Sequence, residues 1–112
     1  MLELRKSPRL NVNWRAGIKL PDGRFIFCHV MNISSEGLLF HSPENLIVLR
    51  GYPMMIEIPG IDGAEQMYKV SCKGIVKHTI LSSDYYRIGV LLTDISSLHQ
   101  ELVNAWLSKV SK

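Results

Sequence analysis

Residues 12–23 read VNWRAGIKLPDG, and this stretch shows the pattern on which most of the chain is built. Apolar side chains occupy every second position from Val12 to Leu20, and polar or charged residues occupy most positions between them. This period of two predicts a strand with one buried face. Pro21-Asp22-Gly23 then combines a fixed φ, a side-chain acceptor and a residue that tolerates positive φ, which predicts a turn. Residues 24–33 are therefore expected to return as a second strand.

The remaining sequence predicts four more strands and one helix. The further strands are expected at residues 37–41, 54–58, 69–77 and 86–93. The segment 43–51 fits a loop and a crossover equally well. The period then changes to the three- and four-residue spacing of an amphipathic helix, which is set by Leu98, Leu102, Ala105 and Trp106. Ser97 with Gln100 three residues later matches a capping box at the start of this helix.

Six short strands separated by turns and followed by a helix favour a small barrel. We predict a mainly β fold, a six-stranded antiparallel split β-barrel with a C-terminal α-helix. No repeat, linker or low-complexity tract divides the chain, and a length of 112 residues suits a single domain. Within this domain, residues 1–11 are expected to form a basic arm, residues 12–93 the barrel and residues 96–110 the helix.

Composition and charge exclude several classes of protein. The 13 Lys and Arg residues exceed the 10 Asp and Glu residues by only three, too few to indicate a nucleic-acid binder by charge alone. Cys28 and Cys72 have no close Cys or His neighbour in the sequence, so we expect no disulfide framework and a reducing compartment. The apolar stretches are too short for a membrane span, and the N-terminus lacks the apolar core of a signal peptide. We therefore expect a cytoplasmic protein that does not insert into membranes.

The sequence contains no motif for catalysis. It has neither a G-x-S-x-G nucleophile turn nor a glycine-rich phosphate loop followed by lysine. The histidines lack the H-x-x-x-H and H-x-E spacings, so a metal site is not expected. We predict a protein that is not an enzyme and has no cofactor.

The first candidate binding motif is Arg5-Lys6-Ser7-Pro8-Arg9, an R-x-x-x-R pattern. Pro8 disfavours the helical conformation at Ser7, which indicates an extended or turning segment. Two guanidinium groups up to ~13 Å apart can straddle a ligand that has more than one anionic group. A guanidinium also pairs with phosphate or with N7 and O6 of guanine, and its face stacks on a base. Taken alone, the motif favours the alternative of a solvated basic arm at a frayed terminus.

The second candidate is Asn32-Ile33-Ser34-Ser35-Glu36-Gly37, an N-x-S-x-x-G pattern. Asn32 and Ser34 are two residues apart at a strand end, so we expect their side chains on the same side. The Asn32 carbonyl can accept from N1 and N2 of guanine, and the Ser34 hydroxyl can donate or accept. Gly37 permits positive φ and the close approach of a ligand or a strand. A turn or bulge in which these residues serve their own backbone explains the pattern equally well.

Together, Arg5-x-x-x-Arg9 and Asn32-x-Ser34-x-x-Gly37 resemble the two-part motif of the PilZ domain. That family consists of bacterial receptors for cyclic di-GMP, built on a six-stranded barrel with a C-terminal helix. The resemblance implies that Arg5 and Arg9 bind phosphate and stack on guanine. It also implies that Asn32 and Ser34 hydrogen-bond a guanine edge, while Gly37 leaves room beside the ring. Asn32 stands where aspartate is more common, and its neutral carbonyl is a weaker acceptor.

The resemblance implies a non-catalytic receptor whose ligand is cyclic di-GMP. Arg87 in the last strand is a further candidate contact with this ligand. The N-terminal arm would fold over the ligand and expose a new surface to a downstream protein partner. The machinery of motility, pili or exopolysaccharide would supply that partner.

Two alternatives stay open. The first is an adaptor of the same fold that acts in pilus or flagellar machinery and does not bind nucleotide. The second is a small barrel that binds single-stranded nucleic acid, which requires aromatic side chains exposed on a basic face. The aromatic residues of this chain mostly occupy positions expected to face inward, so we expect no nucleic-acid partner.

Overall fold

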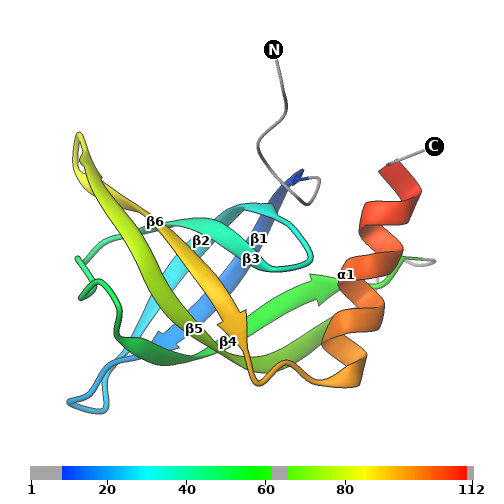
Figure 1. The fold of residues 1–112 in the computed structure, drawn as a ribbon, viewed down its shortest axis with the longest axis horizontal. Coiled ribbons are helices and arrows are strands. Elements are labelled where there is room, and N and C mark those ends of the chain that lie inside the picture. The colour runs from blue at the N-terminus through cyan, green and yellow to red at the C-terminus, as the bar shows by residue number, and fades with distance from the viewer. Residues whose placement is uncertain (1–8, 62–65, 111–112) are drawn as a thin grey trace.

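The computed structural model describes residues 9–61 and 66–110. In these ranges the chain forms six strands and one helix (Figure 1). The elements are β1 (Leu10–Lys19), β2 (Phe25–Ile33), β3 (Gly37–Ser42), β4 (Gly51–Pro59), β5 (Met67–Ser82), β6 (Tyr85–Thr93) and α1 (Ser97–Val110). The strands are antiparallel and close into a barrel in the order β1-β2-β3-β6-β5-β4. The predicted fold class is confirmed.

The barrel interior is filled by the apolar residues that alternate along each strand. In β1, Trp14, Ala16 and Ile18 are buried, and the residues between them are half-buried or exposed. The turn that follows is the predicted one, since Gly23 has a φ of 92° and its N–H donates to the Leu20 carbonyl at 2.9 Å. The buried residues of the other five strands include Val30, Phe40, Met54, Ile56, Val70, Val76, Ile88 and Val90. Both cysteines are free and lie in this core.

Some boundaries differ from those predicted. β1 begins at Leu10, inside the predicted basic arm, because Leu10 and Asn11 already pair with the end of β2. β4 is longer than predicted and contains Pro53 and Pro59, which were expected to bound it. β4 pairs with β1 only from Met54 to Ile56, so both prolines lie where β4 has an open edge.

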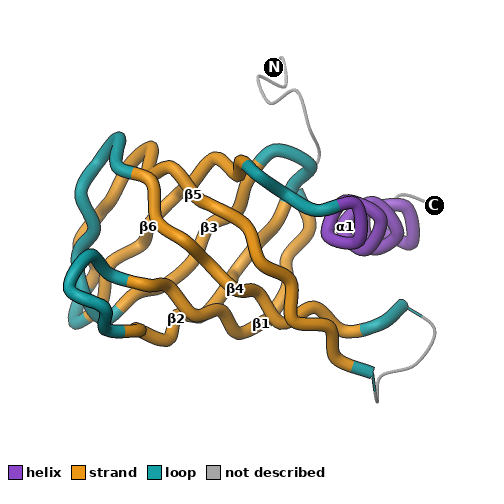
Figure 2. The backbone as a smooth tube through the Cα atoms, turned by 90° about the horizontal axis from the view of Figure 1, so that it is seen from below, coloured by secondary structure: helices purple, strands orange, loops and turns teal. Residues whose placement is uncertain are grey.

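The helix α1 lies alongside one end of the barrel (Figure 2). The Trp106 ring meets the Trp14 ring edge-on at 6.0 Å, and its Nε1 donates to the Pro59 carbonyl at 2.8 Å. The helix is capped by Ser96, whose Oγ accepts from the His99 N–H at 3.1 Å. The predicted capping box at Ser97 is therefore wrong by one residue. Within the described ranges, no helix has both the length and the apolar character needed to cross a bilayer.

Candidate functional site

Asn32 occupies an irregular part of β2. It pairs with Asn11 of β1 and with Leu39 of β3, and the register of both ladders shifts beside it. Irregularities of this kind redirect side chains. The Oδ1 atom of Asn32 accepts a hydrogen bond from Nη1 of Arg9 at 2.8 Å. The structure thus brings together residues of the two sequence motifs.

Ser34 organises the turn between β2 and β3. Its Oγ accepts from the N–H groups of Glu36 at 3.3 Å and Gly37 at 3.2 Å, and its own N–H donates to the Gly37 carbonyl at 2.9 Å. The residue is only 6% exposed. A hydroxyl engaged in this way fixes the backbone of a turn. The contacts of Ser34 therefore fit the alternative given above for the N-x-S-x-x-G pattern, in which its side chains hydrogen-bond the backbone of the turn.

Gly37 lies where β3 passes close to β6. A Cβ atom at this position would overlap the carbonyl oxygen of Val90, so no side chain fits. The turn is also tied to β6 by the N–H of Leu92, which donates to the Glu36 carbonyl at 2.9 Å. Among the described glycines only Gly23 has a positive φ, so the need for glycine at position 37 is steric.

A shallow pocket of about 240 Å³ adjoins this turn. Ser34 and Gly37 line it on one side together with Arg9. The outer faces of β3, β6 and β5 form another part of the wall, where Leu39, Gly89 and His78 lie side by side. The His78 ring covers Gly89, because a Cβ atom on that glycine would overlap the imidazole. The pocket therefore combines backbone, a guanidinium and an exposed imidazole.

The charges that line the pocket are mixed. Arg9 and Lys77 contribute cationic groups, and Glu36 contributes a carboxylate. Lys77 and His78 were not identified as site residues from the sequence. They lie where the β5–β6 register shifts, between Val76 and His78, and no local spacing in the sequence marks such a shift. The strand alternation alone therefore could not place them beside Gly89.

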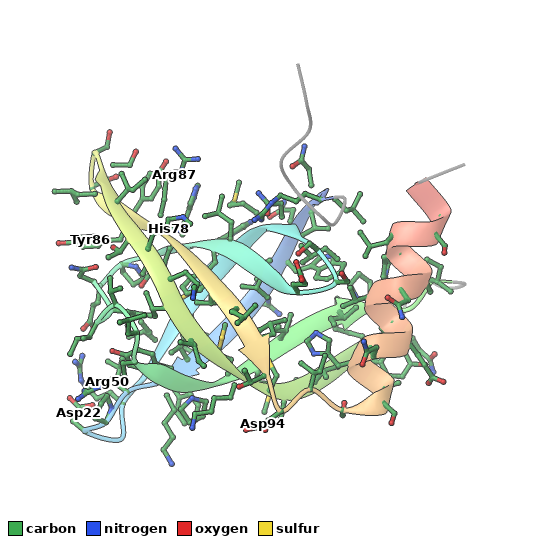
Figure 3. All side chains as sticks on the ribbon, viewed as in Figure 1. Asp22, Arg50, His78, Tyr86, Arg87 and Asp94 are labelled. Atoms are coloured by element: carbon green, nitrogen blue, oxygen red, sulfur yellow. The ribbon has the colours of Figure 1, made fainter. Side chains whose placement is uncertain are left out.

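Arg87 lies beside the pocket and not among the residues that line it. It is two residues from Gly89 on the same strand, a separation of ~7 Å. Arg87 pairs with His41 of β3 and Ile80 of β5, and it lies on the same side of the β5–β6 hairpin as His78 (Figure 3). Burial, with help from the charge of Arg87, lowers the pKa of His41.

The predicted site is partly assembled in the described residues. Arg9, Ser34 and Gly37 line the pocket, and Asn32 joins them through its bond to Arg9. Arg5, the other half of the R-x-x-x-R pattern, lies outside the described residues. In residues 9–61 and 66–110, no cluster of His, Cys, Asp or Glu side chains could hold a metal ion.

The sequence matches the family model of the PilZ domain over residues 3–109. The chain belongs to the PilZ family. No curated protein matches this PilZ domain by sequence.

Several solved structures have the same fold as this PilZ domain. The inhibitor of motility MotI/DgrA of Bacillus subtilis superposes with a TM-score of 0.78 at 14% identity, over 99% of this chain and 54% of that one. The MrkH–c-di-GMP complex of K. pneumonia gives 0.71 at 16% identity, over 98% and 53%. The PilZ domain of YcgR from Escherichia coli with c-di-GMP gives 0.66 at 12% identity, over 97% and 92%. This chain spans about half the length of the MotI/DgrA and MrkH chains.

Proposed function

We propose that this PilZ domain is a non-catalytic receptor for cyclic di-GMP. The hydrogen bond between Arg9 and Asn32 carries the proposal, because it joins the two motifs at the edge of a pocket. The matched structures of YcgR and MrkH contain this ligand, which supports the choice of ligand class.

Cyclic di-GMP has two phosphates and two guanines, and the residues around the pocket suit both. Arg9, together with Arg5, would bind phosphate through the planar guanidinium and stack on guanine through its face. The Asn32 carbonyl already accepts from Arg9 but has a second lone pair for N1 or N2 of guanine. Arg87 lies two residues from Gly89 on β6, beside the pocket, and would contact the outer part of the ligand.

Ser34 and Gly37 would act mainly on the shape of the site. The Ser34 hydroxyl donates only a long 3.4 Å bond to the Gly37 carbonyl, so its proton can turn to an acceptor on a guanine edge. Its acceptor side stays bound to the turn. Gly37 allows β3 to approach β6 closely and thereby leaves the pocket open beside the turn.

The proposed output is a change in the N-terminal arm. Ligand phosphates would fix Arg5 beside Arg9, which Asn32 already positions, and the ordered arm would present a new surface to a downstream protein partner. Trypsin is expected to cleave the free protein after Arg5 and Lys6, and bound cyclic di-GMP should protect these bonds. Equal cleavage of the free and saturated protein would contradict the switch even if the ligand binds.

Isothermal titration calorimetry with cyclic di-GMP tests the proposed binding. We expect the wild type to bind and the variants Arg9→Ala and Asn32→Ala to bind much more weakly. Arg50→Ala is the matched control, since Arg50 is an exposed arginine that lies near Asp22 and outside the pocket lining (Figure 3). A folded wild-type protein that does not bind would exclude the receptor and leave the adaptor of the same fold.

A further inference from the structure

Three large apolar side chains are exposed together on the outer face of the barrel. Phe25 and Phe27 of β2 are 58% and 80% exposed, and Met55 of β4 is 40% exposed. The two phenylalanines are exceptions to the inward placement predicted for the aromatic residues. Single exposed apolar residues are common, whereas apolar side chains exposed as a group are typical of interaction sites.

The depression among these side chains is a slot of about 320 Å³. Gly17 of β1 lines it, and cross-strand pairing sets Gly17 between Phe27 on one side and Met55 on the other. Because Gly17 has no side chain, the backbone forms the base of the slot. None of the residues that line it also lines the pocket beside Ser34.

The fold does not require a glycine at position 17. A Cβ atom there would meet only Phe25 Cδ1, at an ordinary contact distance of 3.9 Å, and its φ is not positive. At Gly37, Gly74 and Gly89, by contrast, a Cβ atom would overlap a neighbour. Glycine in a strand interior costs stability relative to a residue with a side chain. The slot is therefore a feature that the packing of the barrel leaves unexplained.

The rim of the slot is mainly basic. Arg15 and Lys69 line the slot, and Lys19 lies beside it because it pairs with Phe25. Among the described residues that line the slot, the only carboxylate is that of Glu57, whose Oε1 is 3.0 Å from Nη2 of Arg15. Two copies meeting through this face would bring like charges together, whereas a partner with carboxylates would complement the rim.

We propose that this slot docks a protein partner, which inserts one apolar side chain between Phe27 and Met55 and places carboxylates against Arg15 and Lys69. At about 320 Å³, the slot has room for a large apolar side chain such as leucine, methionine or phenylalanine. Single-stranded nucleic acid fits less well, because it stacks successive bases along an extended basic groove, whereas this slot is a single depression among apolar side chains. The proposal does not depend on binding of cyclic di-GMP.

The test uses defined peptides and nuclear magnetic resonance. The probe is a peptide with one central leucine flanked by glutamates, and the two controls replace the leucine by serine or the glutamates by lysines. At millimolar concentration we expect the leucine–glutamate peptide to shift the amide signals of Gly17, Phe27 and Met55, and both controls to bind at least tenfold more weakly. Equal binding of the three peptides, or shifts centred elsewhere, would overturn the proposal.

Two variants tie the signal to the slot. Gly17→Val fills the base of the slot with a residue that strands favour, and Phe27→Ser removes one wall at a position that is 80% exposed. Both should abolish peptide binding and retain the thermal stability and any cyclic di-GMP affinity of the wild type. If either folded variant still binds the peptide as the wild type does, the slot is not the docking site.

Other occupants give different results. In sedimentation equilibrium, we expect the wild type not to associate as its concentration rises. An association that Gly17→Val abolishes would assign the slot to a second copy of this chain. An oligothymidylate that shifts the same amides more strongly than the leucine–glutamate peptide would assign it to nucleic acid. Either result would overturn the proposal without bearing on the cyclic di-GMP site.

Discussion

Nη1 of Arg9 donates a 2.8 Å hydrogen bond to Oδ1 of Asn32, which lies 23 positions further along the chain. A bond between such solvent-accessible groups contributes little to the stability of the fold. The bond instead fixes a position, because it holds the Arg9 guanidinium at the edge of the pocket before a ligand arrives. Holding a side chain in its binding position reduces the entropy lost when the ligand binds.

Replacing Arg9 by lysine tests whether the guanidinium or only its charge matters. We expect Arg9→Lys to weaken cyclic di-GMP binding by roughly tenfold or more, about 1.4 kcal/mol, and to approach Arg9→Ala. Lysine retains the charge but has neither the planar fork nor a face that stacks on guanine. Calorimetry on the wild type and both variants measures the difference. Wild-type affinity in Arg9→Lys would show that charge alone acts at this position.

Cyclic di-AMP distinguishes recognition of guanine from recognition of phosphate. Adenine has no hydrogen on N1 and no 2-amino group, so a site in which the Asn32 carbonyl accepts from N1 or N2 of guanine should bind cyclic di-AMP far more weakly. Linear single-stranded DNA should also fail to compete at moderate salt. Competition against labelled cyclic di-GMP measures both effects. Equal affinity for the two cyclic dinucleotides would mean that only the phosphates are recognised.

Removing the Ser34 hydroxyl should affect both stability and binding. The N–H groups of Glu36 and Gly37 would lose their acceptor, so we expect Ser34→Ala to lower the free energy of unfolding by about 1–2 kcal/mol. Affinity for cyclic di-GMP should fall as well, because the turn lines the pocket. Urea denaturation and calorimetry measure these changes, with Ser71→Ala on the exposed face of β5 as control. Unchanged stability and affinity would contradict both roles.

The barrel was predictable because alternation is a local property of each strand. Trp14, Ala16 and Ile18 show the buried face of β1 within a few residues. The extent of β4 was not predictable in this way. Pro53 and Pro59 remove backbone donors, which predicts strand ends, but only the complete barrel shows that β1 leaves β4 unpaired at both positions.

The candidate site also contains residues that the sequence could predict and residues that it could not. The spacing of the two motifs led to Arg9 and Asn32, which the structure joins. The sequence could not show that Lys77 and His78 line the same pocket, since this depends on the β5–β6 register and on a shift within it. The exposure of Phe27 was also missed, because β2 is apolar on both faces and alternation does not assign its outer face.

Two glycines offer a matched pair of substitutions. Gly37→Ala should destabilise the fold strongly, since the new Cβ would overlap the Val90 carbonyl and force β3 from β6. Gly17→Ala should leave stability unchanged or raise it by about 0.4–1 kcal/mol, because a Cβ there meets an ordinary contact and alanine restricts the unfolded chain. Thermal unfolding compares the two variants with the wild type. Equal effects would contradict the close approach of β3 and β6.

The buried imidazole of His99 predicts a dependence of stability on pH. His99 is 2% exposed, its Nδ1 has no hydrogen-bond partner among the described residues, and burial lowers its pKa. A base whose pKa is lower in the folded state binds protons more readily when the chain unfolds. The stability is therefore fully present above the unfolded pKa of ~6.5 and falls as the pH drops below it.

We expect the free energy of unfolding to fall between about pH 7 and pH 5, with each such histidine contributing at most ~1.4 kcal/mol per pH unit. His41 contributes in the same direction, because burial and the charge of Arg87 lower its pKa. Urea denaturation across this range should show a shallower dependence in His99→Leu than in the wild type, and a separate, smaller change in His41→Gln. Leucine fills the buried position 99 of α1 without an unpaired polar atom, so His99→Leu should stay folded at the lower pH. A dependence as steep as that of the wild type in His99→Leu would show that the His99 pKa does not change on folding.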